Sequence, residues 1–236
     1  MSKHVLVVGF EPFGGSLVNP SEMLANALAG AKIADRQIST SVLPVETRTL
    51  GERLEQTLLD VQADIILGFG QAGGRSAIAL ERVAVNVLDF EEPDNVGISR
   101  TNEQILRGGP EARLSNLPFE KIIDAWHANG VPSYTSNSAG TFVCNQFLYE
   151  LLGRTENAAP PIIAGFIHLP YLPNQAINAG SQTHPSMSFE LMKKAAEILI
   201  ETLVPWVDNR ISEPTRPRDP AKPQMWIPRG IKEAER

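Results

Sequence analysis

The sequence predicts an α/β fold built on a parallel or mixed sheet. Short apolar runs rich in β-branched residues stop at a glycine or a turn, as buried strands do, and amphipathic helical patterns lie between them. The chain has 236 residues, which is enough for one domain with a large core. We expect one α/β domain over residues 1–204 and a proline-rich, charged tail over 205–236 that is mostly extended or disordered.

The first strand and helix have the clearest local signals. Residues 4–9, HVLVVG, are an apolar run that ends at a glycine and predict a buried strand. The loop that follows contains Phe10 and Phe13, which either wall a small apolar pocket at the end of the strand or fill the edge of the core. Asn19-Pro20 is an N-cap followed by proline at the first helical position, and Gly30 ends that helix.

The remaining elements follow from the same periodicities. Strands are predicted at 37–43, 64–69, 134–136 and 161–169, with a β-rich stretch at 77–89, and helices at 46–61, 118–130, after Cys144 and at 186–204. Ser186 or Ser188 is expected to cap the last helix. Residues 98–117 have weak periodicity and form either a flap over a site or irregular surface. Residues 174–185 are interpreted as a loop.

The only cysteine, Cys144, stands near the start of a predicted helix. Small polar residues at 136–140 indicate a turn, and Ser138 or Thr141 is expected to cap the helix that follows. The unpaired N–H groups and the dipole of a helix start favour negative charge, so this position is expected to stabilise a thiolate, the reactive form of cysteine. The alternative is a small buried cysteine that packs under the helix.

Two further residues have the chemistry that a reactive thiol needs. His168 lies near the end of an apolar strand, and Glu81 interrupts an apolar run, so its carboxylate is at least partly buried and must be paired. In cysteine hydrolases that transfer an acyl group, the thiolate attacks a carbonyl, an imidazole accepts and returns a proton, and a carboxylate holds the imidazole in its working tautomer. These three residues are therefore a candidate catalytic unit.

Each member of this unit has an alternative interpretation. His168 can equally be a core histidine bonded to the backbone, and Glu81 can form a structural or surface pair with Arg82. The competing residues are the other histidines and two nearby acids: His4, His127, His184, Asp89 and Asp94. One cysteine and four scattered histidines give no metal-ligand spacing, so we expect no metal.

The composition argues against several classes of partner. The formal net charge of −6 disfavours nucleic acid and anionic membranes. No apolar run approaches the ~20 residues that span a bilayer, and the N-terminal run is too short for a signal peptide. A single cysteine cannot form an internal disulfide, and a thiol that must stay reduced fits the cytoplasm.

Four stretches resemble the signature segments of the pyroglutamyl peptidase I family, also called pyrrolidone carboxyl peptidases. They are GFEPFGG at 9–15, GQAGGR at 70–75, SNSAGTFVCN at 136–145 and GFIHLPYLP at 165–173. The resemblance covers the chain from about Val5 to about Val204, and four motifs in the right order make it specific. The tail lies outside it.

The resemblance implies a cysteine exopeptidase that removes an N-terminal pyroglutamyl (5-oxoproline) residue from peptides, without a metal or an organic cofactor. It implies a Cys-His-Glu triad of Cys144, His168 and Glu81 and a thioacyl intermediate. The implied substrate-binding residues are Phe10, Phe13, Gln71, Phe142 and Val143. The implied fold is a three-layer α/β/α sandwich with a twisted open, mostly parallel mixed sheet. It is often assembled as a tetramer, so we expect a homo-oligomer.

One position departs from the family pattern. The family usually has a D-A-R-I-P-D-N-like stretch after the Glu81 strand, whereas residues 89–95 here are DFEEPDN, so Glu91 replaces the arginine. An acid close to the thiol disfavours both the thiolate and the oxyanion. Arg75 or Arg82 is a candidate to compensate. Otherwise the protein is a related thiol amidase with a changed substrate or a catalytically weakened lactam-binding protein.

We predict that Glu91→Arg raises kcat/KM on a pyroglutamyl arylamide, because it restores a cation near the developing negative charge. Steady-state kinetics of the two proteins tests this. An unchanged or lower value would show that position 91 is not part of the site.

Overall fold

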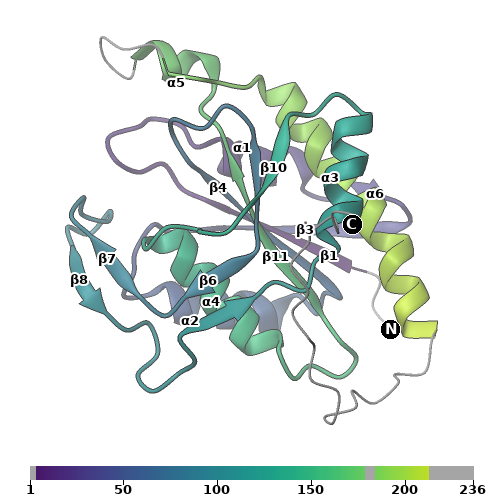
Figure 1. The fold of residues 1–236 in the computed structure, drawn as a ribbon, viewed down its shortest axis with the longest axis horizontal. Helices are drawn as coiled ribbons and strands as arrows, with labels where there is room; N and C mark the ends of the chain where they lie inside the picture. The colour runs from purple at the N-terminus through teal and green to yellow at the C-terminus, as the bar shows by residue number, and fades with distance from the viewer. Residues whose placement is uncertain (1–3, 179–183, 213–236) are drawn as a thin grey trace, which may run out of the picture.

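The computed structural model describes residues 4–178 and 184–212 (Figure 1). Its centre is a seven-stranded sheet with the order β10-β5-β11-β4-β1-β3-β2. The strands are β1 (His4–Phe10), β2 (Lys32–Ile33), β3 (Arg36–Leu43), β4 (Ile65–Gln71), β5 (Ile78–Glu81), β10 (Ser133–Ser136) and β11 (Ile163–Leu169). Neighbours pair in parallel, except that β5 is antiparallel to β11 and β2 is antiparallel to β3.

Helices cover both faces of this sheet (Figure 1). One layer holds α1 (Pro20–Leu28), α3 (Phe119–Ala128) and α6 (Phe189–Ser212), and the other holds α2 (Leu50–Asp60) and α4 (Val143–Thr155). The short helix α5 (Pro173–Asn178) follows β11. The structure therefore confirms the predicted three-layer α/β/α sandwich with a mostly parallel mixed sheet.

The two cores arise because successive strand residues point to opposite faces. In β1, Val5 and Val7 belong to the core under α1, α3 and α6, whereas Leu6 and Val8 belong to the core under α2 and α4. All four side chains are fully buried. An uninterrupted apolar run is thus what a strand covered on both faces requires.

Two predicted caps are confirmed. The Asn19 side chain accepts a hydrogen bond of 3.0 Å from the Ser21 backbone N–H, and Pro20 is the first residue of α1. At the start of α6, the Ser188 hydroxyl accepts from the Leu191 N–H at 3.3 Å. Each cap satisfies a backbone donor that the first turn of a helix leaves unpaired.

Two helix boundaries were predicted wrongly. Helix α2 begins at Leu50 rather than at residue 46, because Thr47 is held in a loop by the Asp94 carboxylate. Helix α6 does not end near residue 204 but continues through Pro205 to Ser212. Beyond that proline, the buried Val207 side chain and an ion pair between Asp208 and Arg36 fasten the helix to the sheet. Residues 213–236 of the predicted tail lie outside the described part of the chain.

The weakly patterned regions contain short elements. The stretch at 77–89 is divided among β5, β6 (Val83–Val85) and β7 (Leu88–Phe90), which belong to three different sheets. Residues 98–117, expected to be a flap or irregular surface, contribute β8 (Arg100–Glu103) to β7 and β9 (Ala112–Leu114) to β6, both antiparallel. The loop predicted from residue 174 instead begins with α5.

Glycine in β4 allows α4 to approach the sheet closely. A Cβ on Gly68 would lie 2.3 Å from Phe147 Cε1 and 2.6 Å from Phe166 Cδ2, so the two rings occupy the space of the missing side chain. This contact sets the height of α4 above the strand.

Among the described helices, none is both long and apolar enough to cross a membrane.

We predict that Gly68→Ala destabilises the fold by about 1–3 kcal/mol, because two buried rings must move to admit one methyl group. The midpoint of thermal or denaturant unfolding measures this change. The matched control is Gly51→Ala in α2, where the added Cβ meets only the end of the Glu150 side chain and alanine favours the helix. Equal stability of Gly68→Ala and the wild type would contradict the close packing.

Candidate active site

The sheet register places two of the predicted catalytic residues on one face. His168 pairs with Gly70 of β4, and Glu81 of β5 pairs with Phe166 of β11. Residues paired directly across a sheet point to the same side, and Phe166 belongs to the core under α4. Both His168 and Glu81 therefore point toward α4.

Cys144 reaches the same place from above. It is the second residue of α4, and its Sγ lies 3.0 Å from the position that a Cβ on Gly70 would occupy. Since Gly70 is the direct neighbour of His168 in the register, the thiol lies over the strand beside the imidazole. The structure thus brings the three predicted side chains together on one face of the sheet.

A buried hydrogen-bond chain fixes the imidazole. Glu81 is fully buried, and its Oε1 lies 2.7 Å from His168 Nδ1. The same oxygen accepts from Arg75 Nη1 at 2.8 Å. An ionised carboxylate only accepts, so Nδ1 of His168 bears the hydrogen and Nε2 is left as a proton acceptor. The predicted burial and pairing of Glu81 are confirmed, with Arg75 and His168 rather than Arg82 as the partners.

The expected side-chain cap of α4 is absent. Phe142 is the N-cap residue and makes no capping side-chain bond. The Ser138 hydroxyl accepts from the Gly140 N–H at 3.2 Å, and the Thr141 hydroxyl donates to the Asp89 carbonyl at 2.6 Å. Both hydroxyls shape the preceding loop instead. The first N–H groups of α4, including that of Cys144, are consequently available to an oxyanion.

The expectation of a resting thiolate was wrong. Burial first, and then the charge of Glu81, raise the pKa of the Cys144 thiol to about 12, whereas Arg75 and the backbone N–H of Cys144 act in the opposite direction. Burial also lowers the pKa of His168, although Glu81 opposes that shift. At neutral pH the pair is therefore an uncharged thiol and an uncharged imidazole. Helix position alone did not reveal how deeply the sulfur is buried.

A small cavity with three phenylalanines in its lining adjoins the thiol. It holds about 230 Å³ of space between atoms, its mouth included. Its lining contains all five predicted pocket residues together with Cys144 and three others: Phe10, Phe13, Asn19, Val45, Gly70, Gln71, Phe142, Val143 and Cys144. The Phe13 and Phe142 rings lie 6.1 Å apart, centroid to centroid, and Phe90 packs on Phe142 at 4.6 Å. Such walls suit a small, flat, uncharged ligand.

Sequence reasoning missed several of these lining residues. Asn19 was identified only as a helix cap, Gly70 only as part of a glycine-rich loop, and Val45 was not singled out. Val45 is held in place because its N–H donates to the Glu11 carboxylate at 3.1 Å, which also accepts from Asn95 at 2.7 Å. This bond is made between loops that are distant in the chain, so no local pattern indicates it.

The competing histidines and acids have other roles. His127 lies 3.0 Å from the Ser133 carbonyl, and the His184 ring packs edge-on against Tyr171. The Asp94 carboxylate accepts hydrogen bonds from Thr47, Val96 and Ile98. Burial acts to raise the pKa of Asp94, but these bonds outweigh it, and the net effect is a lowered pKa. Asp94 is thus a structural acid that joins two loops.

Glu91, the position that departs from the family pattern, lies at the surface. Its side chain is exposed, and the charges that act on Cys144 are those of Glu81 and Arg75. Of the two arginines considered as compensating cations, Arg75 lies in the site, whereas Arg82 packs over the Phe119 ring. The acid at position 91 is therefore not one of the charges that oppose the thiolate, and the structure argues against the gain in kcat/KM expected for Glu91→Arg.

The sequence of the chain matches the model of the pyroglutamyl peptidase family over residues 3–205. The chain belongs to this family. A pyrrolidone-carboxylate peptidase of Pyrococcus furiosus is 45% identical over 199 residues, which are 84% of this chain and 96% of that protein. A pyrrolidone-carboxylate peptidase of Bacillus subtilis is 37% identical over 214 residues, which are 91% of this chain and 98% of that protein.

Solved structures agree with this family assignment. The crystal structure of the pyrrolidone carboxyl peptidase from Pyrococcus furiosus superimposes with a TM-score of 0.84 at 43% sequence identity. The match covers 86% of this chain and 99% of that one. Likeness over nearly the whole relative shows that the described sheet and helices are the family's fold.

We predict that kcat/KM falls only at acid pH, with a midpoint below about 6.5, because the depressed pKa keeps His168 an uncharged base until more protons are present. Glu81→Gln should move this midpoint to lower pH, since Glu81 is the group that raises the pKa of His168. The pH–rate profiles of both proteins test this. A midpoint above 6.5, or a shift upward in the variant, would contradict the assignment.

Proposed function

We propose that this protein is a cysteine peptidase that removes pyroglutamate from the N-terminus of peptides, with Cys144, His168 and Glu81 as its triad. The observation that carries the proposal is the thiol of Cys144 in the wall of a small aromatic cavity. A second support is the bond of 2.7 Å between the neighbouring imidazole and a buried carboxylate. Its relatives named pyrrolidone-carboxylate peptidase support the same substrate.

The uncharged resting pair defines the first chemical step. As the Cys144 sulfur bonds to the pyroglutamyl carbonyl carbon, its proton passes to Nε2 of His168. The carbonyl oxygen becomes an oxyanion, for which the N–H groups at the start of α4 are the available donors. Glu81 stabilises the imidazolium that forms, and Arg75 shares the carboxylate charge.

The remaining steps of the reaction return the proton and release the products. The tetrahedral centre collapses, the C–N bond breaks, and His168 gives its proton to the leaving amine. A thioester between Cys144 and the pyroglutamyl group remains. Water then attacks this thioester as His168 accepts a proton from it, and the imidazolium returns that proton to the departing sulfur. Free pyroglutamate leaves and the starting state is restored.

The cavity explains why a lactam is preferred to an ordinary N-terminus. Pyroglutamate is a flat, uncharged ring with one N–H and one C=O, which aromatic walls and backbone groups can accommodate. An ordinary N-terminal residue would bring an ammonium group into an apolar slot. Burying that charge without a partner costs several kcal/mol, which corresponds to roughly a thousandfold discrimination.

We also propose a homo-oligomer, a tetramer by family resemblance, and a reducing compartment such as the cytoplasm. The unpaired thiol of Cys144 supports a reducing compartment, because an oxidising environment would oxidise the nucleophile. The mass of the protein in solution, measured by light scattering, tests whether it is a homo-oligomer. A monomer at working concentration would contradict it.

We predict that Cys144→Ser and His168→Ala each lower kcat on a pyroglutamyl arylamide by about a thousandfold or more. Iodoacetamide should abolish the wild-type activity, and a chelator should leave it unchanged. The matched control is His127→Ala, which removes an exposed imidazole from α3 and should keep full activity. Hydrolysis that persists without Cys144 would remove the whole mechanism.

A further inference from the structure

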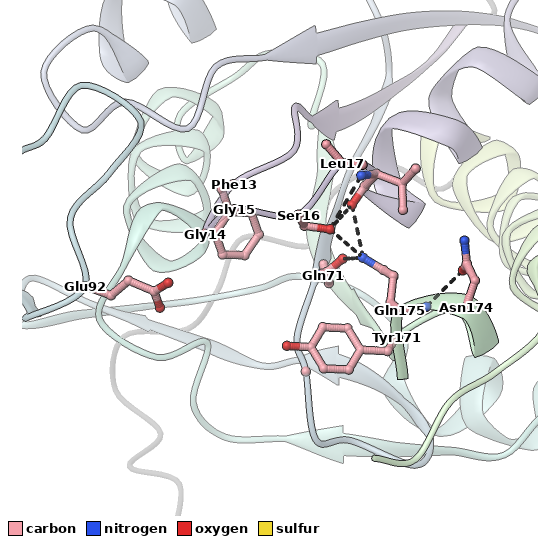
Figure 2. Close-up of a pocket in the computed structure, with 12 residues that line it drawn as sticks. Phe13, Gly14, Gly15, Ser16, Leu17, Gln71, Glu92, Tyr171, Asn174 and Gln175 are labelled. Atoms are coloured by element: carbon pink, nitrogen blue, oxygen red, sulfur yellow. Dashed lines mark hydrogen bonds between the residues drawn. The ribbon is translucent and has the colours of Figure 1, made fainter. Parts of the chain in front are cut away.

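A second, larger cavity adjoins the small one. It holds about 1420 Å³ of space between atoms, its opening included, and shares Phe13 and Gln71 with the small cavity. Figure 2 shows its walls, which come from the loop at 13–18, from the end of β4 and from α5. Because the two cavities share these residues, the larger one lies within reach of the residues that follow a ring held in the small cavity, although Cys144 and His168 do not line it.

The side chain of Gln71 belongs to the larger cavity. Gly70 faces Cys144, so the next residue of β4 points to the opposite face of the sheet. The register agrees, because Gln71 pairs with Leu169, which lies in the core on the far side from α4. The backbone of Gln71 thus borders the small cavity, while its amide group projects into the large one.

The orientation of a second amide, that of Gln175 in α5, is fixed by backbone groups. Its Oε1 accepts from the Leu172 N–H at 2.9 Å, and its Nε2 donates to the Val18 carbonyl at 3.0 Å. An N–H cannot accept and a carbonyl cannot donate, so this amide cannot be turned over. Nε2 of Gln175 also lies 3.1 Å from the Ser16 hydroxyl oxygen and 2.7 Å from Oε1 of Gln71, which is the shortest of its three contacts (Figure 2). The atom of Gln71 that faces this donor is therefore its oxygen.

Gln71 is consequently left with an unused donor. Its Oε1 is occupied by Gln175, and its Nε2 has no hydrogen-bond partner among the described residues. That nitrogen is also not among the unpaired atoms that are sealed from solvent. Two amide hydrogens at the boundary of the cavities are therefore available to a ligand with an acceptor oxygen.

We propose that Gln71 donates to a backbone carbonyl of the peptide that follows the scissile bond, and that Gln175 is the positioning residue that keeps this donor directed into the cavity. The proposal rests on the proposed function and adds a specificity to it. Leaving groups that carry a peptide carbonyl are favoured over leaving groups without one. The lactam ring is not the partner, because it lies on the other side of the Gln71 backbone.

The test compares two substrates, pyroglutamyl-alanine amide and pyroglutamyl β-naphthylamide, whose leaving group has no oxygen. Gln71→Leu removes the donor. Gln175→Glu keeps an acceptor for Leu172 but cannot donate, so Gln71 must turn its nitrogen inward and present its oxygen to the cavity. For each variant we expect the ratio of kcat/KM on the peptide to that on the arylamide to fall about fivefold to tenfold, mainly through KM of the peptide.

The double variant Gln71→Leu/Gln175→Glu should lose no more than Gln71→Leu alone, because Gln175 acts through Gln71. The matched control is Gln56→Leu, an exposed amide on α2, which should leave the ratio unchanged. An equal loss on both substrates, or an unchanged ratio, would overturn the proposal while leaving the proposed function intact. A wild-type protein that hydrolyses neither substrate would overturn the proposed function and this inference with it.

Discussion

The hydrogen bond between Glu81 and His168 is the interaction on which the rest of the site depends. A carboxylate with no exposed surface costs several kcal/mol to bury unless it is paired, and here one oxygen serves both the imidazole and Arg75. The antiparallel placement of β5 beside β11 is what brings Glu81 and His168 to one face. The irregular topology of an otherwise mostly parallel sheet thus has a chemical consequence.

Two glycines of β4 make room for the other part of the site, the thiol of Cys144. At Gly68 and Gly70 the strand has no side chains on the α4 face, and two phenyl rings and the sulfur of Cys144 fill that space. The thiol is therefore close to the imidazole and half-buried against the sheet, and this burial is the main cause of its raised pKa. In the proposed mechanism, reactivity comes from a positioned base rather than from a thiol that is already ionised.

The sequence was sufficient to predict hydrophobic patterns that repeat along the chain and residues that mark the end of a helix or strand. Apolar runs such as that of β1, the cap at Asn19 and the residues at the ends of strands were identified, and with them Cys144, His168 and Glu81 but not every residue that lines the cavity. The sequence could not decide between a thiolate and a buried thiol at Cys144, because the outcome depends on what packs above Gly70 rather than on helix position. Strands β8 and β9 were missed because they are short and pair with distant segments. The role of Gln175 was missed because an amide in a predicted loop has no periodic signal.

Helix α6 has a practical consequence for where this domain ends. The match to the family model stops at residue 205, yet the helix continues to Ser212 and its Asp208 pairs with Arg36, a residue with 1% exposure. A shortened chain that stopped at the family boundary would leave that cation with Asp64 as its one remaining carboxylate partner in a nearly dry setting. A chain cut at residue 205 would therefore lose the turns of α6 that hold the helix against Arg36 of β3.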